Sequence, residues 1–239
     1  MAEATRPIWP GLWDEADDRA PRRRSLSRAT IVETALEIVD NEGLDALSMR
    51  RIAQELNTGP ASLYAHISNK EQLVELVLDQ VYADLVHPVP DPGCWQQQFK
   101  DFARQARDVL VAHNDISKVA IASNIPTLPH ALDATETMIG LLRAGGLAEQ
   151  VIAYGVDLVG MYLVAAAYEL SERSGPKASP EYAEVYLQGI RDYFASLPPE
   201  RYPLLIAMIP ALTHGAGDER FDFGLDVILA GLRVQSGQE

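Results

Sequence analysis

The sequence predicts an all-α protein with an N-terminal three-helix head, which contains a helix-turn-helix, and a larger helical body. Apolar residues recur at helical spacing through most of the 239 residues, and strand-like alternation is rare. Pairs made of glycine or proline at 145–146, 175–176 and 198–199 break the pattern into separate segments. We expect an arm over residues 1–24, the head over 25–88 and the body over 93–235.

The acidic charge of the chain is unevenly distributed. The formal net charge is −14, yet residues 22–70 carry seven Lys or Arg against six Asp or Glu, a net of +1. Residues 1–21 carry −3, which leaves −12 for the rest of the chain. An acidic body repels a polyanion such as DNA, so that only the head would dock on it. We therefore expect weak non-specific DNA binding with a shallow salt dependence.

Cysteine usage and hydropathy indicate a soluble cytoplasmic protein. The single cysteine, Cys94, excludes an intramolecular disulfide and any all-cysteine metal site, and we expect neither a metal nor a cofactor. No secretory leader is visible at the start of the sequence. The longest apolar run, 158–167, has the length of a buried core helix rather than of a membrane span.

The first 24 residues have the composition of a poorly ordered arm. Trp9 and Trp13 stand among proline and acidic residues, and three arginines follow at 22–24. The arginines are either a solvated charge run or an arm that reaches the DNA backbone or minor groove beside the head.

A first helix is expected to begin at Ser27, a good N-cap residue, and to end at Gly43. Its predicted buried face consists of Ile31, Ala35, Ile38 and Val39.

Residues 48–70 have the pattern of a helix-turn-helix. Ser48 stands at an N-cap position, and the helix after it has an apolar stripe made of Met49, Ile52, Ala53 and Leu56. Asn57 suits the left-handed backbone of the turn. Gly59 and Pro60 then open the second helix, because proline loses no hydrogen bond at the first helical position.

The second helix of the motif is predicted to read DNA. With Leu63 and Ile67 buried, the outward face consists of Ala61, Ser62, Tyr64 and Ala65. Such a helix enters the major groove while the first helix lies across the backbone. A helical hairpin that binds no DNA remains the alternative.

The run from Leu63 to Lys70, Leu-Tyr-Ala-His-Ile-Ser-Asn-Lys, resembles the LYxHxxxK signature of the TetR family of transcriptional regulators. The resemblance implies a repressor that leaves its operator when a small-molecule effector binds, and it implies that Tyr64 and Lys70 hold phosphates. The sequence departs from the family pattern at Asn57-Thr58, Ala65 and Ser68.

Few side chains of this motif can donate hydrogen bonds to the edges of DNA bases. Arg50 is the one side chain that can make a bidentate contact to a guanine, and its alternative role is to bind a phosphate. His66 is expected to be half-buried at the edge of the motif. The expected DNA-binding residues are Ser48, Arg50, Thr58, Gly59, Pro60, Ala61, Ser62, Tyr64, Ala65, His66 and Lys70.

A long fourth helix is predicted to join head and body. It begins at Ser68 or Asn69, with Ser68 and Glu71 at capping-box spacing, and ends before the prolines at 88, 90 and 92. Its predicted apolar seam consists of Leu73, Val77, Val81 and Leu85.

The body is expected to contain helices over 95–113, 116–122, 129–144, 148–174, 180–197 and 218–234. The resemblance implies a small, largely apolar effector, and each candidate for its pocket is alternatively an ordinary core residue. The candidates are Trp95, Phe99, His113, Met138, Tyr154, Met161, Tyr162 and Tyr168.

The last helix is expected to form a homodimer interface with its counterpart. The resemblance implies that the last and third-last helices form a four-helix bundle, so the operator should be a pseudo-palindrome. Gly224 and Gly231 would allow close approach of two backbones. The expected interface residues are Phe221, Leu225, Ile228, Leu229 and Leu232.

An enzyme is not expected, because the sequence contains none of the common metal, dinucleotide or phosphate-loop motifs. A helical adaptor without specific DNA binding is the alternative to a regulator.

Overall fold

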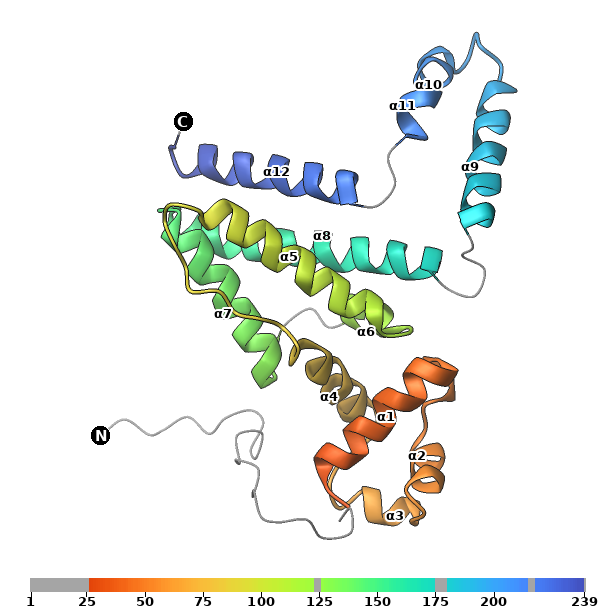
Figure 1. Ribbon diagram of the computed structural model, residues 1–239, viewed down its shortest axis with the longest axis vertical. Helices are drawn as coiled ribbons and strands as arrows, with labels where there is room; N and C mark the ends of the chain where they lie inside the picture. The colour runs from red at the N-terminus through yellow and green to blue at the C-terminus, as the bar shows by residue number, and fades with distance from the viewer. Residues whose placement is uncertain (1–25, 123–125, 175–179, 215–217, 239) are drawn as a thin grey trace.

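The computed structural model describes residues 26–122, 126–174, 180–214 and 218–238, and within these ranges it contains helices and no strand. The head comes first in the chain and the helices of the body follow it (Figure 1). The helices are α1 (Arg28–Glu42), the short 3₁₀ helix η1 (Leu44–Ala46), α2 (Met49–Glu55), α3 (Pro60–Leu63), α4 (Lys70–Tyr82), α5 (Trp95–Ala112), α6 (Ile116–Ala122), α7 (Pro129–Ala144), α8 (Glu149–Ser174), α9 (Pro180–Ala195), α10 (Pro203–Ala207), α11 (Ile209–Leu212) and α12 (Asp218–Gln235).

The head forms as its sequence predicts. The Ser27 hydroxyl accepts a hydrogen bond from the Thr30 N–H at 3.1 Å, and Gly43 ends α1 with a φ of +86°. Asn57 adopts the left-handed backbone with a φ of +52°. The core of the head buries most of the predicted faces of its helices; Leu56 alone of the predicted set is only half-buried. The buried residues are Ile31, Ala35, Ile38, Val39, Met49, Ile52, Ala53, Leu63 and Ile67.

The fourth helix begins at the second of its two predicted caps. The Asn69 side chain accepts a hydrogen bond from the Gln72 N–H at 2.7 Å, so Asn69 is the N-cap of α4. The Gln72 side chain in turn accepts from the Ser68 N–H at 2.7 Å. The predicted capping box between Ser68 and Glu71 is therefore wrong. The capping side chains are those of Asn69 and Gln72, one residue later, because the chain is still extended at Asn69. The predicted seam of Leu73, Val77, Val81 and Leu85 is buried. The predicted end of the helix is wrong, because α4 ends at Tyr82 and Leu85 lies in the segment after it.

The helices of the body lie within two residues of their predicted bounds. The core is formed mainly by α5, α7 and α8, and it fully buries Phe99, Leu110, Leu141, Leu142 and Val159. The short helices η1, α10 and α11 are not predicted, because three to five residues show no periodicity. Proline opens α10 and stands near the start of α11.

Ion pairs join α5 and α12 along their length, and the two helices run in opposite directions. Lys100 contacts Asp226 at 2.8 Å, Arg104 contacts Asp222 at 2.7 Å, and Arg107 contacts Asp218 at 2.8 Å. We call these three pairs the α5–α12 ladder. Beside it, α8 and α12 approach closely at two glycines. A Cβ atom on Gly224 would lie 2.1 Å from the Tyr162 hydroxyl, and one on Gly155 would lie 2.8 Å from Leu232.

Helices α9, α10 and α11 pack mainly against one another and stand away from the rest of the body (Figure 1). Their exposed apolar side chains include Val185, Tyr186, Tyr193, Leu204, Met208 and Leu212.

Candidate nucleic-acid interface and ligand cleft

The second helix of the motif presents its predicted face to solvent. Helix α3 ends at Leu63, and a turn covers residues 64–66. The Leu63 carbonyl accepts from the Ile67 N–H at 3.0 Å, which keeps Ile67 buried although the α-helix is short. His66 is half-buried, as predicted, and Thr58 is likewise half-buried. The predicted contact residues that lie exposed on this surface are Gly59, Pro60, Ala61, Ser62, Tyr64, Ala65 and Lys70.

Two adjacent arginines in α2 have different surroundings. Arg51 bridges Glu42 and Glu55, both at 2.6 Å, and these hydrogen bonds, first the one to Glu42, raise the pKa of Arg51. The hydrogen bond from Arg51 likewise lowers the pKa of Glu42. Arg50, the predicted contact residue, is exposed. Ser48 caps α2 by accepting from the Arg51 N–H at 3.1 Å.

Helix α4 anchors the head to the body through Asp79, a buried carboxylate. One oxygen accepts from the Ala131 N–H at 3.0 Å, and the other lies 2.9 Å from His130 Nδ1. Both partners stand in the first turn of α7, whose own N-cap, Leu128, has no side-chain acceptor. Asp79 therefore caps α7 from a neighbouring helix. Burial, with a smaller contribution from Asp79, also raises the pKa of Tyr82 to about 12.

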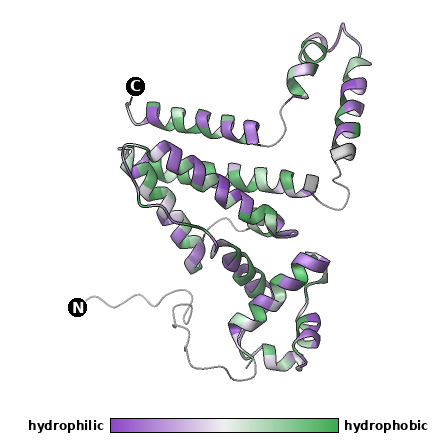
Figure 2. Ribbon diagram, in the orientation of Figure 1, coloured by the Kyte–Doolittle hydropathy of each residue, from purple (hydrophilic) through white to green (hydrophobic). Residues whose placement is uncertain are grey.

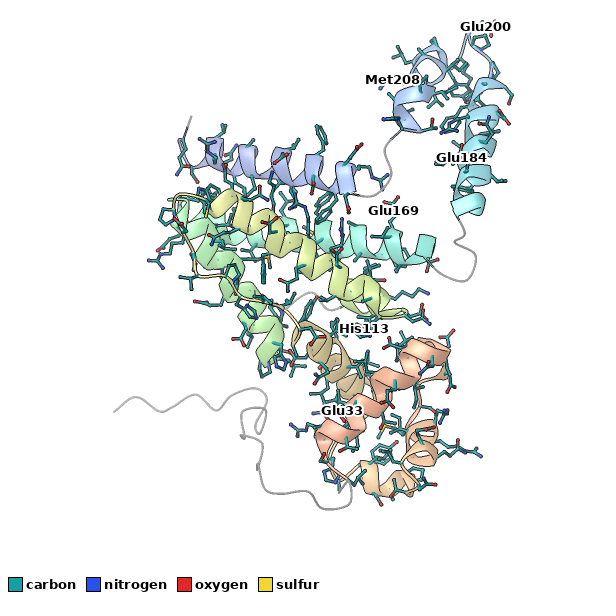
Figure 3. The ribbon with its side chains drawn as sticks, viewed as in Figure 1. Glu33, His113, Glu169, Glu184, Glu200 and Met208 are labelled. Atoms are coloured by element: carbon teal, nitrogen blue, oxygen red, sulfur yellow. The ribbon has the colours of Figure 1, made fainter. Side chains whose placement is uncertain are left out.

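A cleft of about 210 Å³ opens between α5, α8 and α12. Its aromatic wall is the stacked pair Tyr162 and Phe221, whose ring centroids lie 5.3 Å apart, with the Arg107 guanidinium 4.6 Å from the Phe221 ring centre. The Tyr162 hydroxyl donates to the backbone carbonyl of Arg220, and burial raises the pKa of Tyr162. Glu169, labelled in Figure 3, pairs with Arg220 at the cleft. Aromatic faces and guanidinium groups together suit a planar ligand with polar substituents.

Most of the predicted ligand residues do not line this cleft; of that set, only Tyr162 does. Trp95 and Phe99 are core residues, and Met138 packs against the core. His113 lies where the body meets the head (Figure 3) and contacts Asp40 of α1. The remaining three, Tyr154, Met161 and Tyr168, are exposed.

The predicted dimer stripe is wrong for α12. Phe221, Leu225, Leu229 and Leu232 are buried in the protomer, and Ile228 is partly buried against the same core. A second subunit cannot reach the four buried side chains, because α5 and α8 already cover this face. Ile228 keeps part of its surface exposed and stays a prediction. Gly224 likewise faces Tyr162 of its own chain, whereas a Cβ on Gly231 would meet nothing within 4 Å.

A different face of α12 is open, and it is apolar as well. Phe223, Val227 and Val234 are exposed, with Phe223 at 69% and Val227 at 55%. On α8 the large exposed apolar residues are Tyr154, Leu158, Met161 and Tyr168. Hydrophobic residues recur along both helices in Figure 2. We call these α8 and α12 side chains the open face.

By length and composition, Glu149–Glu172 of α8 is also apolar enough to cross a membrane, and 28% of its most apolar stretch is buried in the protomer. The apolar surface that α8 leaves exposed in the protomer is also typical of a subunit interface. Among the described residues, no three His, Cys, Asp or Glu side chains cluster as a metal site. The predicted arm over residues 1–24, with its three arginines, lies outside the described residues.

Two family models match the chain. One, described as bacterial regulatory proteins of the tetR family, covers residues 31–77, and the other, described as the tetracyclin repressor-like C-terminal domain, covers residues 87–236. The first covers most of α1, all of α2 and α3 and most of α4, and the second spans the body helices.

Several known proteins resemble the chain over most of its length. The HTH-type transcriptional repressor DrrR1 of Streptomyces coeruleorubidus is 32% identical over 95% of this chain and 85% of its own. The TetR family protein ActR of Streptomyces coelicolor, solved in complex with actinorhodin, is 42% identical, with a TM-score of 0.82 over 90% of this chain and 99% of that one. ActR in complex with (S)-DNPA is similar at a TM-score of 0.79, with 88% of this chain and 98% of that one covered at 41% identity.

These matches cover both parts of the molecule, and the family is one of transcriptional regulators rather than of enzymes. The chain therefore belongs to the TetR family and is a dimeric, ligand-responsive, DNA-binding transcriptional regulator.

Proposed function

We propose that the protein is a cytoplasmic repressor that binds a pseudo-palindromic operator as a homodimer and leaves it when a planar aromatic effector occupies the cleft between α5, α8 and α12. Residues 25–88 act as the DNA-binding domain and residues 93–235 as the effector-binding and dimerisation domain. The observation that carries the proposal is the exposed surface of α3 and the turn after it, with Tyr64 exposed in that turn and Lys70 exposed at the start of α4.

The residue types on this surface suit DNA. The Tyr64 phenol at the end of α3 and the Lys70 ammonium group at the start of α4 can each hold a phosphate and so fix the position of α3 in the groove. Ala61 and Ala65 offer methyl contacts to thymine, and Arg50 offers the bidentate contact to guanine. Arg51 is held by two carboxylates, which leaves Arg50 as the arginine of α2 that we assign to the DNA.

The open face supports the dimer. Helices α8 and α12 each expose large apolar side chains that water solvates poorly, and a second copy of the same surface would cover them. Two heads related by a twofold axis then require two half-sites about one helical turn, or a multiple of it, apart.

DNA binding is tested with a duplex selected from a random-sequence library by the wild-type chain. We expect the Lys70→Ala variant to lower affinity for the selected and random duplexes alike and to reduce the slope of log affinity against log salt by about one. Arg143→Ala is the matched control, because it removes one cation from an exposed position on α7 and should change neither quantity. Equal binding of wild type and Lys70→Ala would contradict the proposed interface.

The effector site is tested with actinorhodin, the compound bound by ActR, added to the complex with the selected duplex. We expect release of the duplex from wild type and no release from Ala166→Leu, whose added atoms fill the cleft. Ala148→Leu adds the same atoms at an exposed position before α8 and should respond as wild type does. Retention of the duplex by wild type would exclude this compound, and equal release from both variants would exclude the cleft.

A further inference from the structure

The head touches the body at a second place, apart from α4. Here the end of α1 and the start of η1 meet the loop between α5 and α6. Asp40 of α1 accepts a hydrogen bond from the Asn114 N–H at 3.2 Å, and its other oxygen lies 2.9 Å from His113 Nδ1. The contact joins residues more than seventy positions apart, so it exists only when head and body are docked.

Asp115 makes a further contact at this junction. Its Oδ2 atom accepts a hydrogen bond from the Leu44 N–H at 3.1 Å. A Cβ atom on Gly43 would lie 3.1 Å from the same oxygen, so a side chain there would crowd it. Asp115 itself has a φ of +59°, a conformation that costs about 1 kcal/mol for most residues and that Asn, Asp and Gly tolerate best. The backbone is thus held in an unfavoured conformation that aims this carboxylate at the head.

The far side of Asp115 is tied to the body. Its Oδ1 atom accepts from Lys118 Nζ at 2.5 Å, and Lys118 also lies 3.3 Å from Glu172, near the end of α8. The hydrogen bond from Lys118 is the main cause of a lowered pKa of Asp115. Directly before Lys118, the buried Ser117 hydroxyl lies 2.8 Å from that of Ser171 in α8. Helix α6 is therefore fastened to α8 on one side and to the head on the other.

We propose that Asp115 is a positioning residue that sets the orientation of the DNA-reading head on the body, through its hydrogen bond to the Leu44 N–H. Leu44 begins η1, the segment between α1 and α2, so holding it restrains both helices. Helix α4 is the first attachment of the head, and it packs against α5, α6 and α7, with Asp79 hydrogen-bonded to the start of α7. The junction at Asp40 and Asp115 is a second attachment away from α4. It restrains rotation of the head about α4, and in a dimer it thereby helps to fix the separation of the two recognition surfaces.

Two substitutions at Asp115 separate this role from simple structural support. Both Asn and Gly accept a positive φ. Asp115→Asn keeps a carbonyl oxygen for the Leu44 N–H, whereas Asp115→Gly keeps the backbone conformation but has no acceptor. Both variants lose the charge that pairs with Lys118, so a difference between them reports the contact to the head.

Head orientation is measured in the full-length dimer, without DNA, by electron spin resonance distances between two labelled heads. The natural Cys94 is replaced by serine, and the label is attached at Gln54→Cys, an exposed position on α2. We expect a broad distance distribution for Asp115→Gly and a wild-type distribution for Asp115→Asn. Equal distributions for the two variants, or a wild-type distribution for Asp115→Gly, would overturn the proposal.

The consequence for DNA is measured with unlabelled protein and the selected duplex. If the head of Asp115→Gly is correctly oriented only about one-tenth of the time, its apparent affinity falls about tenfold, while Asp115→Asn stays within about twofold of wild type. Thermal unfolding of each variant shows whether it is folded. This second measurement rests on the proposed operator binding, and the first does not. Suppose that the distance distribution broadens for Asp115→Gly but the wild-type chain selects no duplex from the library. That result would support the positioning role and contradict the proposed operator binding.

Discussion

The open face offers the most direct test of how two copies assemble, and Phe223 is its largest exposed side chain on α12. Its exposed fraction is 69%. A phenylalanine presents about 200 Å², so about 140 Å² is available for burial, worth up to about 3.5 kcal/mol at about 25 cal/mol per Å². Burial of about half of that area contributes about 2 kcal/mol per copy, and therefore about 4 kcal/mol per dimer.

Replacement by alanine should weaken the dimer without unfolding the protomer. Because about 1.4 kcal/mol corresponds to a factor of ten, we expect Phe223→Ala to raise the dimer dissociation constant by several hundredfold to about a thousandfold. Sedimentation equilibrium over a range of protein concentrations measures this constant directly. Circular dichroism of the same samples should report unchanged helix content.

Two control variants complete the experiment. Leu225 is fully buried in the protomer, so Leu225→Ala should lower the free energy of unfolding by about 2–5 kcal/mol. Val89→Ala trims an exposed apolar residue in the segment between α4 and α5, outside the open face, and should leave both dimerisation and stability unchanged. An unchanged dissociation constant for Phe223→Ala would refute the assignment of the open face.

Three further outcomes are expected. Gly224→Ala places a Cβ atom against the Tyr162 ring, and urea unfolding should show a loss of about 1–3 kcal/mol. Asp79→Ala leaves the Ala131 N–H without its acceptor and should cost about 1–3 kcal/mol, whereas Asp79→Asn, which keeps an acceptor, should cost less. The hydrogen bond from Arg104 lowers the pKa of Asp222 below the usual 3.8, so its stabilisation is present above that pH and is lost as the pH falls through the lowered value. Acid unfolding monitored by circular dichroism should therefore be less steep for Asp222→Asn, and equal profiles would contradict the pairing.

The head was predictable because its signals are local. Ser27, Ser48 and Asn57 each act on a backbone group within a few residues, so their types and spacing determine the caps and the turn. Glycine and proline breaks likewise predicted the bounds of the body helices. The error at the cap of α4 arose because Ser68 and Asn69 are both good cap residues. The end of α4 was also predicted too late, because the apolar spacing continues to Leu85 although the helix ends at Tyr82.

The body surfaces were not predictable in the same way. Helix α12 is apolar on two faces, one with Leu225 and one with Phe223 and Val227, and periodicity does not say which of them a second subunit covers. One signal was present: Asp218, Asp222 and Asp226 repeat every four residues and match the cations of α5 in reverse order. The ligand cleft depends on how α5, α8 and α12 pack, and the sequence carries no local signal for that.

The α5–α12 ladder also bears on how salt titrations of this protein should be interpreted. Its acidic partners Asp226 and Asp218 are largely solvated, so mobile ions weaken these pairs as well as the contacts to phosphate. Added salt then acts at two sites. It weakens the contacts between the protein and the DNA phosphates, and it weakens the attachment to α5 of α12, the helix that carries half of the open face. We therefore expect the plot of log affinity against log salt concentration to be curved for the natural dimer. The same plot should become linear when the two subunits are covalently linked.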